Sequence, residues 1–166
     1  MATHRISILG AGTTPDTSGD VFFEPYSVTD TATIADPMIL NFALGSTRQG
    51  AHGSFQVPQN FVGTVQVIVL WVANATTGNA IFEFDYIAVA DTQDPGAAVT
   101  ESDTNTLGTD GTAFRLNTTT ITGITSGNFA IGDQVVFTLF RDQADANDTL
   151  AVDALVLGVL FEYADA

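Results

Sequence analysis

The sequence predicts an all-β protein, an antiparallel β-sandwich of the jelly-roll type with about eight or nine strands and little or no helix. Three observations lead to this prediction. Apolar residues alternate with other residues along many short segments, as they do in strands, where successive side chains point to opposite faces. Residues typical of turns, namely Gly, Asn, Asp and Pro, separate these segments. No long amphipathic helical pattern lies between them, which favours antiparallel pairing over parallel βαβ units.

Two central segments carry the clearest strand signals. Residues 64–72 place Trp71 and three valines on one side and further apolar residues on the other, so both faces are expected to be covered. Residues 80–89 place aromatic side chains, among them Phe84, on one side only. The polar residues 74–79 between them tolerate turn geometry. We therefore predict a central β-hairpin with its aromatic side in the core.

Other strand candidates precede and follow this pair: residues 5–9, 21–24, 38–43, 53–57, 113–121, 133–140 and 150–163. The alternation along the segments predicts a largely aromatic core: Trp71, Phe82, Phe84, Tyr86, Phe137, Leu139, Leu157 and Phe161. Residues 45–50 and 92–112 are rich in turn residues and lack apolar periodicity, so both are expected to be loops. Loops as long as residues 92–112 often carry function.

The length of 166 residues suits one domain with its own core. We assign residues 21–166 to this single sandwich. Residues 1–20 contain a tract of small and polar residues after a short alternating segment, and such a tract near a terminus is often mobile. The segment is therefore either an arm that a partner orders or an ordinary first strand.

The charge balance limits the classes of partner. Nineteen acidic residues stand against four arginines and no lysine, and the formal net charge is -15. Such a field repels phosphate backbones and anionic lipids, so neither nucleic acid nor a membrane is an expected partner. No apolar run reaches the roughly 18 residues that a membrane span needs, and the first residues lack the apolar core of a signal peptide. The absence of cysteine excludes disulfides and thiolate metal sites.

The acidic loop of residues 141–148 is a candidate for a metal site. Asp142, Asp145 and Asp148 could supply the oxygen ligands that a hard cation requires, but their spacing does not match an EF-hand. The alternative is a solvated turn, in which these carboxylates cap backbone groups and pair with Arg141. We favour the turn, expect Arg141 to pair with one of the three, and expect no bound metal.

No recognisable catalytic or cofactor motif occurs in the sequence. It has no Gly-x-Ser-x-Gly nucleophile elbow, and Gly10-x-Gly12 lacks the third glycine of a dinucleotide site. Glu83 and Asp85 share one face of a predicted strand about 7 Å apart, and paired carboxylates perform glycoside hydrolysis in some enzymes. We interpret them instead as a solvent-facing acidic stripe. We therefore expect that the protein is not an enzyme and that it binds no cofactor.

Three strings in the second half of the chain resemble a known family: VLWVANATTGNAIFEFDYIAVAD, GTAFRLNTTTITG and GDQVVFTLFRDQADANDTLAVDALVLGVLFEY. They are similar to β-rich head proteins of tailed bacteriophages, which comprise jelly-roll-like capsid decoration (cement) proteins and related head-fibre or tail-fibre modules. The resembling part covers residues 57–163, and its best-matching piece begins at residue 132. This signature consists of hairpin ends and a closing strand and does not point to a catalytic site.

The resemblance implies a structural virion protein that binds the outer capsid surface and stabilises it. The implied partners are the major capsid protein and further copies of the chain in a homotrimer, after synthesis in the host cytoplasm. Candidate capsid contacts lie in the N-terminal segment: His4, Arg5, Ile6 and Ile8. Residues expected to hold the fold are Trp71, Phe84, Arg141 and Asp148.

Two alternatives to the decoration role remain open. One is a head-fibre or tail-fibre module that recognises host surface glycans through exposed aromatic residues with Asp and Asn. Trp71, the only tryptophan, lies mid-strand among valines and is expected in the core rather than in such a site. The other is an enzyme acting on glycans, which only the abundance of acidic residues supports.

Overall fold

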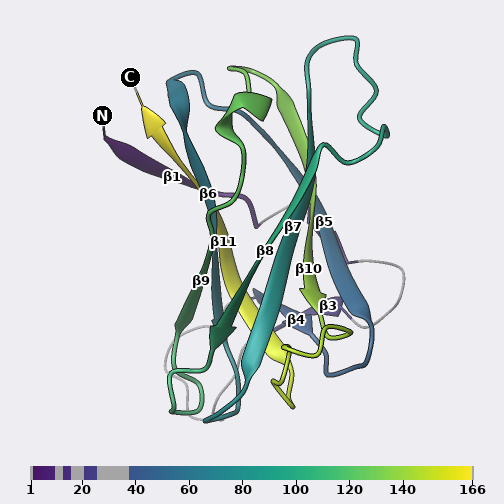
Figure 1. Ribbon diagram of the computed structural model, residues 1–166, viewed down its shortest axis with the longest axis vertical. Helices are drawn as coiled ribbons and strands as arrows, with labels where there is room; N and C mark the ends of the chain where they lie inside the picture. Colours follow the sequence, from purple (N-terminus) through teal and green to yellow (C-terminus); the bar gives the residue numbers. More distant parts are fainter. Residues whose placement is uncertain (1, 10–12, 16–20, 26–37, 166) are drawn as a thin grey trace.

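The chain folds into two antiparallel β-sheets packed face to face (Figure 1). This computed structural model describes residues 2–9, 13–15, 21–25 and 38–165. Eleven strands occur in these ranges: β1 (Thr3–Ser7), β2 (Thr14–Pro15), β3 (Val21–Pro25), β4 (Met38–Phe42), β5 (Arg48–Gln56), β6 (Phe61–Val72), β7 (Asn79–Val89), β8 (Glu101–Gly108), β9 (Asn117–Ile121), β10 (Gln134–Asp142) and β11 (Ala154–Asp165). A short 3-10 turn, η1 (Ser126–Asn128), lies between β9 and β10.

The larger sheet has the order β3-β4-β11-β6-β9, with β1 also pairing with β11, and the smaller sheet has the order β2-β5-β10-β7-β8. Every pairing is antiparallel. The described residues contain no α-helix, and in that part of the chain no helix has the length and apolarity to cross a membrane. The predicted antiparallel sandwich of jelly-roll type is confirmed, with more strands than expected.

The two ends of the chain lie side by side in the larger sheet (Figure 1). β1 pairs with the last part of β11, where Thr3 lies opposite Ala164. β4 pairs with the first part of β11, so the two short strands share one edge of the long one. The described part of the N-terminal segment therefore includes a strand of the sandwich, while residues 10–12 and 16–20 lie outside the description.

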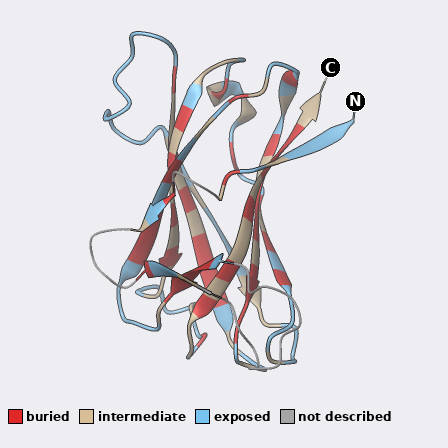
Figure 2. Cartoon of the chain, turned by 180° about the vertical axis from the view of Figure 1, so that it is seen from behind, coloured by how far each residue is buried: buried red, intermediate tan, exposed pale blue. Residues whose placement is uncertain are grey.

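The buried residues lie between the two sheets (Figure 2), and aromatic side chains contact one another across this core. Phe84 of β7 stacks on Phe137 of β10, with ring centroids 5.2 Å apart. Trp71 of β6 reaches from the opposite sheet to Phe82 at 5.8 Å, and its indole N–H donates to Thr119 Oγ1 at 2.9 Å, so the buried ring keeps a polar partner. Seven of the predicted core residues are buried: Trp71, Phe82, Phe84, Tyr86, Phe137, Leu139 and Phe161.

Leu157 does not belong to the core, contrary to the prediction. The strict alternation along the last strand groups Leu157 with Val159 and Phe161. In the structure the pairing of β11 with β6 shifts register between Val156 and Gly158, and Val156 and Val159 are buried while Leu157 is only half-buried. A β-bulge adds one residue to a strand and reverses the alternation beyond it, which explains the error.

The predicted central hairpin is also wrong, although both of its strands exist. β6 pairs with β11 and β9 in the larger sheet, whereas β7 pairs with β10 and β8 in the smaller one. The connection of residues 73–78 therefore crosses between sheets that typically lie about 10 Å apart. An alternating pattern specifies which side of a strand is buried but not which neighbour it pairs with, so the pattern fits both arrangements.

Two predicted loops contain strands. β8 occupies the second half of residues 92–112, and β5 begins at Arg48, inside the predicted loop 45–50. β8 is the edge strand of the smaller sheet, and none of its residues is buried. A strand with little apolar surface to bury has no hydrophobic alternation, so its sequence resembles a loop.

Candidate functional site

A buried ion pair anchors the connection between β10 and β11. Arg141 is fully buried and donates from Nε and Nη2 to the two carboxylate oxygens of Asp148, at 3.1 and 2.9 Å. Its Nη1 donates to the carbonyl oxygen of Val152 at 2.9 Å, and its Nη2 to that of Leu150 at 2.7 Å. Of the three acids predicted as partners of Arg141, Asp148 forms the ion pair, and the arginine also fixes the backbone that follows the loop.

The other acids of this loop cap backbone groups. Asp142 Oδ1 accepts the N–H of Ala144 at 3.1 Å, and Asp145 Oδ1 accepts that of Asn147 at 2.8 Å. Both are local turn bonds typical of Asp. Within the described ranges, no group of three or more His, Cys, Asp or Glu side chains is placed to hold a metal ion. The structure thus assigns Asp142 and Asp145 to a turn and Asp148 to an ion pair.

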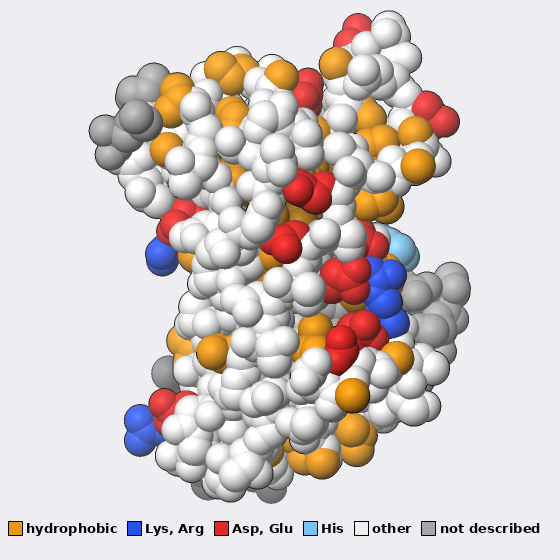
Figure 3. Space-filling view, viewed as in Figure 1, with side chains coloured by type: hydrophobic (Ala, Val, Ile, Leu, Met, Phe, Trp, Pro, Cys, Tyr) orange, Lys and Arg blue, Asp and Glu red, His pale blue; other side chains and the backbone are white. Residues whose placement is uncertain are grey.

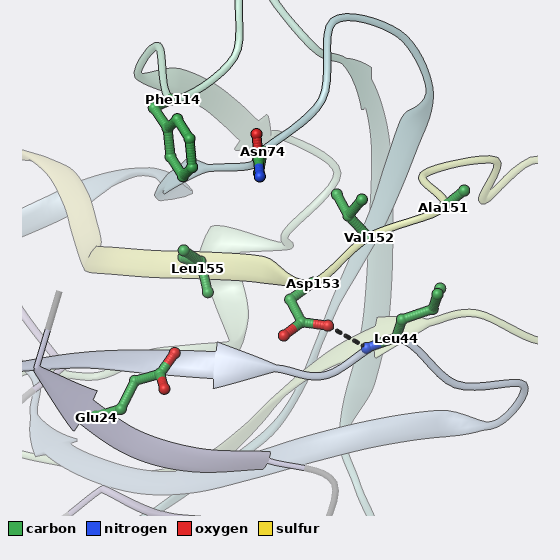
Figure 4. A pocket seen from close by; sticks show the side chains of 8 residues that line it. All are labelled: Glu24, Leu44, Asn74, Phe114, Ala151, Val152, Asp153 and Leu155. Carbon is green, nitrogen blue, oxygen red and sulfur yellow. Dashed lines mark hydrogen bonds between the residues drawn. The ribbon is translucent and has the colours of Figure 1, made fainter. Parts of the chain in front are cut away.

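A pocket of about 490 Å³ lies beside this connection. Eight residues line it: Glu24, Leu44, Asn74, Phe114, Ala151, Val152, Asp153 and Leu155. In Figure 4, Phe114 and Asn74 lie on one side, Glu24 lies on the opposite side, and Asp153 and Leu155 lie between them. The pocket therefore combines an aromatic wall, aliphatic side chains and polar groups, as small-molecule sites commonly do.

A buried amide positions the two acids of the pocket. Asn41 of β4 is 3% exposed, and its Nδ2 donates to Glu24 Oε1 at 2.7 Å and to Asp153 Oδ2 at 3.2 Å. Asp153 Oδ1 also accepts the backbone N–H of Leu44 at 2.7 Å. β4 lies between β3 and β11 in the larger sheet, which is why one side chain reaches both carboxylates. Each carboxylate therefore has a fixed position and still has unused acceptor capacity.

Phe114 forms the aromatic wall in an unusual backbone conformation. Its φ is 60°, a left-handed value that is rare for a non-glycine residue. Its backbone N–H donates to the carbonyl oxygen of Ala73 at 2.8 Å, which ties this segment to the end of β6. The residue is 36% exposed. Strained backbone of this kind costs about 1–3 kcal/mol and concentrates at functional sites, so an exposed aromatic ring held in this way is a candidate binding group.

A smaller hollow of about 190 Å³ adjoins the pocket and shares Leu44 and Ala151 with it. Gln143 braces its rim: the Oε1 atom accepts the N–H of Gly45 at 2.6 Å, and the Nε2 atom donates to the carbonyl oxygen of Ala43 at 2.9 Å. The two hollows therefore adjoin each other along these two shared residues.

The acids predicted as a stripe on β7 form a second polar cluster, on the outer face of the smaller sheet. Arg48 Nε donates to Glu83 Oε2 at 2.8 Å and its Nη2 to Asp85 Oδ2 at 2.7 Å, and Ser102 Oγ lies 2.5 Å from both carboxylates. The guanidinium also stacks on the ring of Phe140, 3.4 Å from its centroid. Figure 3 shows acidic and arginine side chains gathered over this face.

The charged groups of this second cluster pair with one another. Desolvation lowers the pKa of Arg48, but its hydrogen bonds and the charges of Asp85 and Glu83 outweigh that effect and raise it above its usual value. Both carboxylates are tied to the same cation, and an acid or base for hydrolysis needs a proton-transfer partner on the substrate instead. The cluster is therefore a structural ion network.

The predicted partner-contact residues lie on β1 or directly after it: His4, Arg5, Ile6 and Ile8. His4 Nε2 is 2.7 Å from Asp165 Oδ2, and Arg5 pairs with Glu162, so both polar side chains bond to β11. Ile8 is buried in the core, and Ile6 packs against it. Desolvation raises the pKa of Asp165, but the hydrogen bonds from the Ala2 backbone and His4 lower it by more, so the pKa lies below its usual value.

Sequence reasoning missed the pocket. Glu24 and Asp153 lie far apart in the chain, and only the pairing of β3 and β11 with β4 brings them together. Phe114 falls in the predicted strand of residues 113–121, but it precedes β9. An aromatic residue between turn residues, in Gly-Thr-Asp-Gly-Thr-Ala-Phe114, was the one available signal, because such residues are seldom needed for a core.

No protein-family model and no curated protein sequence matches the chain. Among the solved structures that share its fold are two carbohydrate-binding modules. A non-crystalline cellulose specific carbohydrate-binding module, CBM28, is 10% identical, covers 92% of this chain and 89% of its own, and has a TM-score of 0.54. A family 35 carbohydrate-binding module from Clostridium thermocellum is 12% identical, covers 97% of this chain and 98% of its own, and has a TM-score of 0.52.

These comparisons correct the resemblance to bacteriophage decoration proteins. The structural neighbours are carbohydrate-binding modules, and no match supports a phage origin. The quoted strings consist largely of alternating strand residues and turn residues, which many jelly rolls share regardless of function. At such low identities the likeness itself establishes the fold alone.

Proposed function

We propose that the protein is a non-catalytic glycan-binding module and that the pocket between Phe114 and Asp153 is its ligand site. The observation that carries this proposal is the position of an exposed aromatic ring opposite two fixed carboxylates. A pyranose ring has a C–H face, which packs on an aromatic ring, and hydroxyl groups at its edge, which donate to carboxylates. The pocket offers both kinds of partner at once.

Pre-ordered groups favour binding in this site. Arg141 holds the backbone of residues 150–152, Asn41 holds the carboxylates, and the Ala73 carbonyl holds Phe114. A ligand that binds fixed groups loses less free energy to the ordering of side chains. The adjoining hollow at Leu44 extends the site, so an oligosaccharide fits it better than a monosaccharide.

The likeness to two carbohydrate-binding modules supports a glycan over other ligand classes, because this fold in those proteins presents sugar sites. Glycan binding therefore replaces the decoration role as the favoured function. It agrees with the alternative of a module that recognises glycans. A fold does not determine a ligand, so the proposal depends on the pocket itself.

The placement of the two acids supports binding rather than hydrolysis. Glu24 and Asp153 accept from the same Asn41 nitrogen and therefore lie on one side of the pocket. Glycosidases need two carboxyl groups that flank the scissile bond. In this pocket the side facing the acids is formed by Phe114 and Asn74 instead.

The test measures binding to a panel of neutral soluble polysaccharides by affinity electrophoresis and titration calorimetry. Phe114→Ala is expected to weaken binding by about tenfold or more, because it removes the aromatic wall. Leu116→Ala is the matched control, since Leu116 is 57% exposed in the same connection but does not line the pocket. Fluorescence of buried Trp71 checks that both variants fold. Equal binding by Phe114→Ala and the native protein would contradict the proposed site.

A further inference from the structure

The protein has few positively charged side chains, and nearly all of them form ion pairs. The chain has four arginines and no lysine. Arg5, Arg48 and Arg141 each form an ion pair with a carboxylate. Arg115 forms no ion pair with any described residue, and it does not line the pocket although it follows Phe114 in the chain. The protein therefore has almost no cation left to neutralise a further acidic site.

The pocket holds a carboxylate pair that receives none of these charges. Glu24 and Asp153 are bridged by the neutral amide of Asn41, and none of the eight lining residues is basic. The acidic pair of β7, by contrast, is neutralised by Arg48. Two like charges that lie close together without a counterion repel each other, and a bound cation relieves that repulsion.

The same corner also has more hydrogen-bond acceptors than donors. The acceptors that reach the pocket are the carboxylates of Glu24 and Asp153, because Asn41, whose buried Oδ1 atom has no hydrogen-bond partner among the described residues, does not line it. An ionised carboxylate only accepts, at about four lone-pair sites. Among the described residues, the donors directed at Glu24 and Asp153 are the Asn41 amide and the Leu44 N–H. A ligand with N–H donors and positive charge complements this arrangement, whereas a carboxylate or sulfate does not.

We infer that the pocket selects a glycan with protonated amines, such as a chain of 2-amino-2-deoxy sugars, over neutral and anionic glycans. The inference rests on the proposed function and names the substrate class of the same site. An ammonium group carries three donors and no acceptor, which suits an acceptor-rich corner. The net charge of -15 adds a long-range attraction that raises the local concentration of a cationic chain.

The experiment compares three oligosaccharides of equal length: a fully deacetylated amino-sugar chain, its fully N-acetylated form and a uronic acid chain. Calorimetric titrations are run at low salt and at a pH of about 6, below the ordinary pKa of about 7.7–8.0 for an amine such as an α-amino group. The deacetylated chain is expected to bind about tenfold or more tightly than the acetylated one. The uronic acid chain is expected to bind more weakly than both, and added salt should reduce the preference.

Charge-removing substitutions locate the preference. Glu24→Gln and Asp153→Asn keep the shape and an acceptor oxygen but remove one charge each, so each should lower the deacetylated-to-acetylated affinity ratio by about threefold or more. Asp85→Asn is the control, because it changes the net charge equally on the outer face of the other sheet. Its ratio should match that of the native protein.

The outcomes separate the inference from the function on which it rests. Equal affinity for the acetylated and deacetylated chains would overturn the inference and leave glycan binding intact. A preference that survives in the Glu24→Gln/Asp153→Asn double variant would also overturn it, because the amines would then bind elsewhere. If oligolysine displaced the deacetylated chain with equal affinity per charge, the site would recognise charge without a sugar, which again overturns it. Failure of all three chains and of neutral polysaccharides to bind would overturn the proposed function as well.

Discussion

In the described part of the chain, two pairs of carboxylates each share a bridging side chain, one on the outer face of the smaller sheet and one in the pocket. On the sheet face, Glu83 and Asp85 share the guanidinium of Arg48, at 2.8 and 2.7 Å. In the pocket, Glu24 and Asp153 share a neutral amide, at 2.7 and 3.2 Å. The first pair is complete within the chain, whereas the second keeps its charge beside an aromatic wall and a cavity.

The difference indicates which pair serves stability and which serves binding. A pair with its own cation contributes to the folded state and has little left to offer a ligand. A pair without one destabilises the folded protein by mutual repulsion, a cost that persists where function requires it. Changing the counterions of the two regions therefore tests the interpretation directly.

The largest effect is expected where a cation is removed from a fully buried pair. Arg141→Met leaves Asp148, whose side chain is 2% exposed, as an unpaired buried charge and also frees the carbonyl oxygens of Leu150 and Val152. We expect the free energy of unfolding to fall by about 3–5 kcal/mol. Urea unfolding followed by tryptophan fluorescence measures it.

Arg141→Lys is the control for this prediction, because it keeps the charge but loses the two-pronged contact with the carboxylate. Its loss of stability should be smaller than that of Arg141→Met. A loss below about 1 kcal/mol for Arg141→Met would show that the pair behaves like an exposed one.

A smaller loss is expected on the sheet face. Arg48→Gln would turn the pair of Glu83 and Asp85 into a copy of the pocket pair, bridged by an amide without charge. The arginine side chain is 35% exposed, so the loss of its ion pairs and of its contact with Phe140 should cost about 1–2 kcal/mol. The loss should shrink as salt is added, since salt screens the repulsion between the two acids. A loss that does not depend on salt would point to packing instead.

The reverse experiment supplies the pocket with a counterion. Leu44 is 53% exposed, lines both hollows and lies next to Asp153. Leu44→Arg should therefore raise the free energy of unfolding by about 0.2–1 kcal/mol relative to Leu44→Gln. It should also abolish the preference for amine-bearing chains. Retention of that preference would show that Glu24 and Asp153 do not produce it.

These regions also show how much the sequence could predict. The alternation along β6 and β7 correctly identified their buried sides, including Trp71 and Phe84, because burial of a strand face is a local property. The choice of pairing partner is not local, so the two strands were wrongly joined in one hairpin. The bulge at Leu157 reversed the alternation in β11 without any proline or charge to mark it.

The candidate site was less predictable than the core. Arg141 and Asp148 lie seven residues apart, so their pairing could be inferred from one loop. Glu24 and Asp153 meet only through the register of three strands, which no local pattern encodes. The resemblance to phage head proteins rested on strand and turn patterns that other jelly rolls share, and it therefore carried no information about the ligand.

Glu101 is a single carboxylate whose hydrogen-bond donors are all neutral groups. Its oxygens accept from Tyr86 Oη at 2.5 Å, from the N–H and Oγ1 of Thr125 at 2.8 and 2.7 Å, and from Asn128 Nδ2 at 3.3 Å. Desolvation raises the pKa of Glu101, but these hydrogen bonds outweigh it and lower the pKa below its usual value. The bonds hold the η1 turn against the start of β8.

A depressed carboxylate pKa stabilises the folded state above the unfolded value of about 4.3, and that contribution disappears as the pH falls through the folded value. Glu101→Gln cannot titrate, so it should cost about 1 kcal/mol at neutral pH, and the difference from the native protein should shrink below a pH of about 4. Urea unfolding between neutral and acid pH measures both curves.

Glu83→Gln is the control, because Glu83 also accepts from Ser102 of β8 but has Arg48 as its counterion. A constant difference between Glu101→Gln and the native protein across this range would mean that the four bonds do not depend on the charge. The neutral donors around Glu101 would then stabilise the fold through packing and not through the charge of the carboxylate. The contrast between a charged and a neutral bridging group would in that case apply only to the pairs Glu83–Asp85 and Glu24–Asp153.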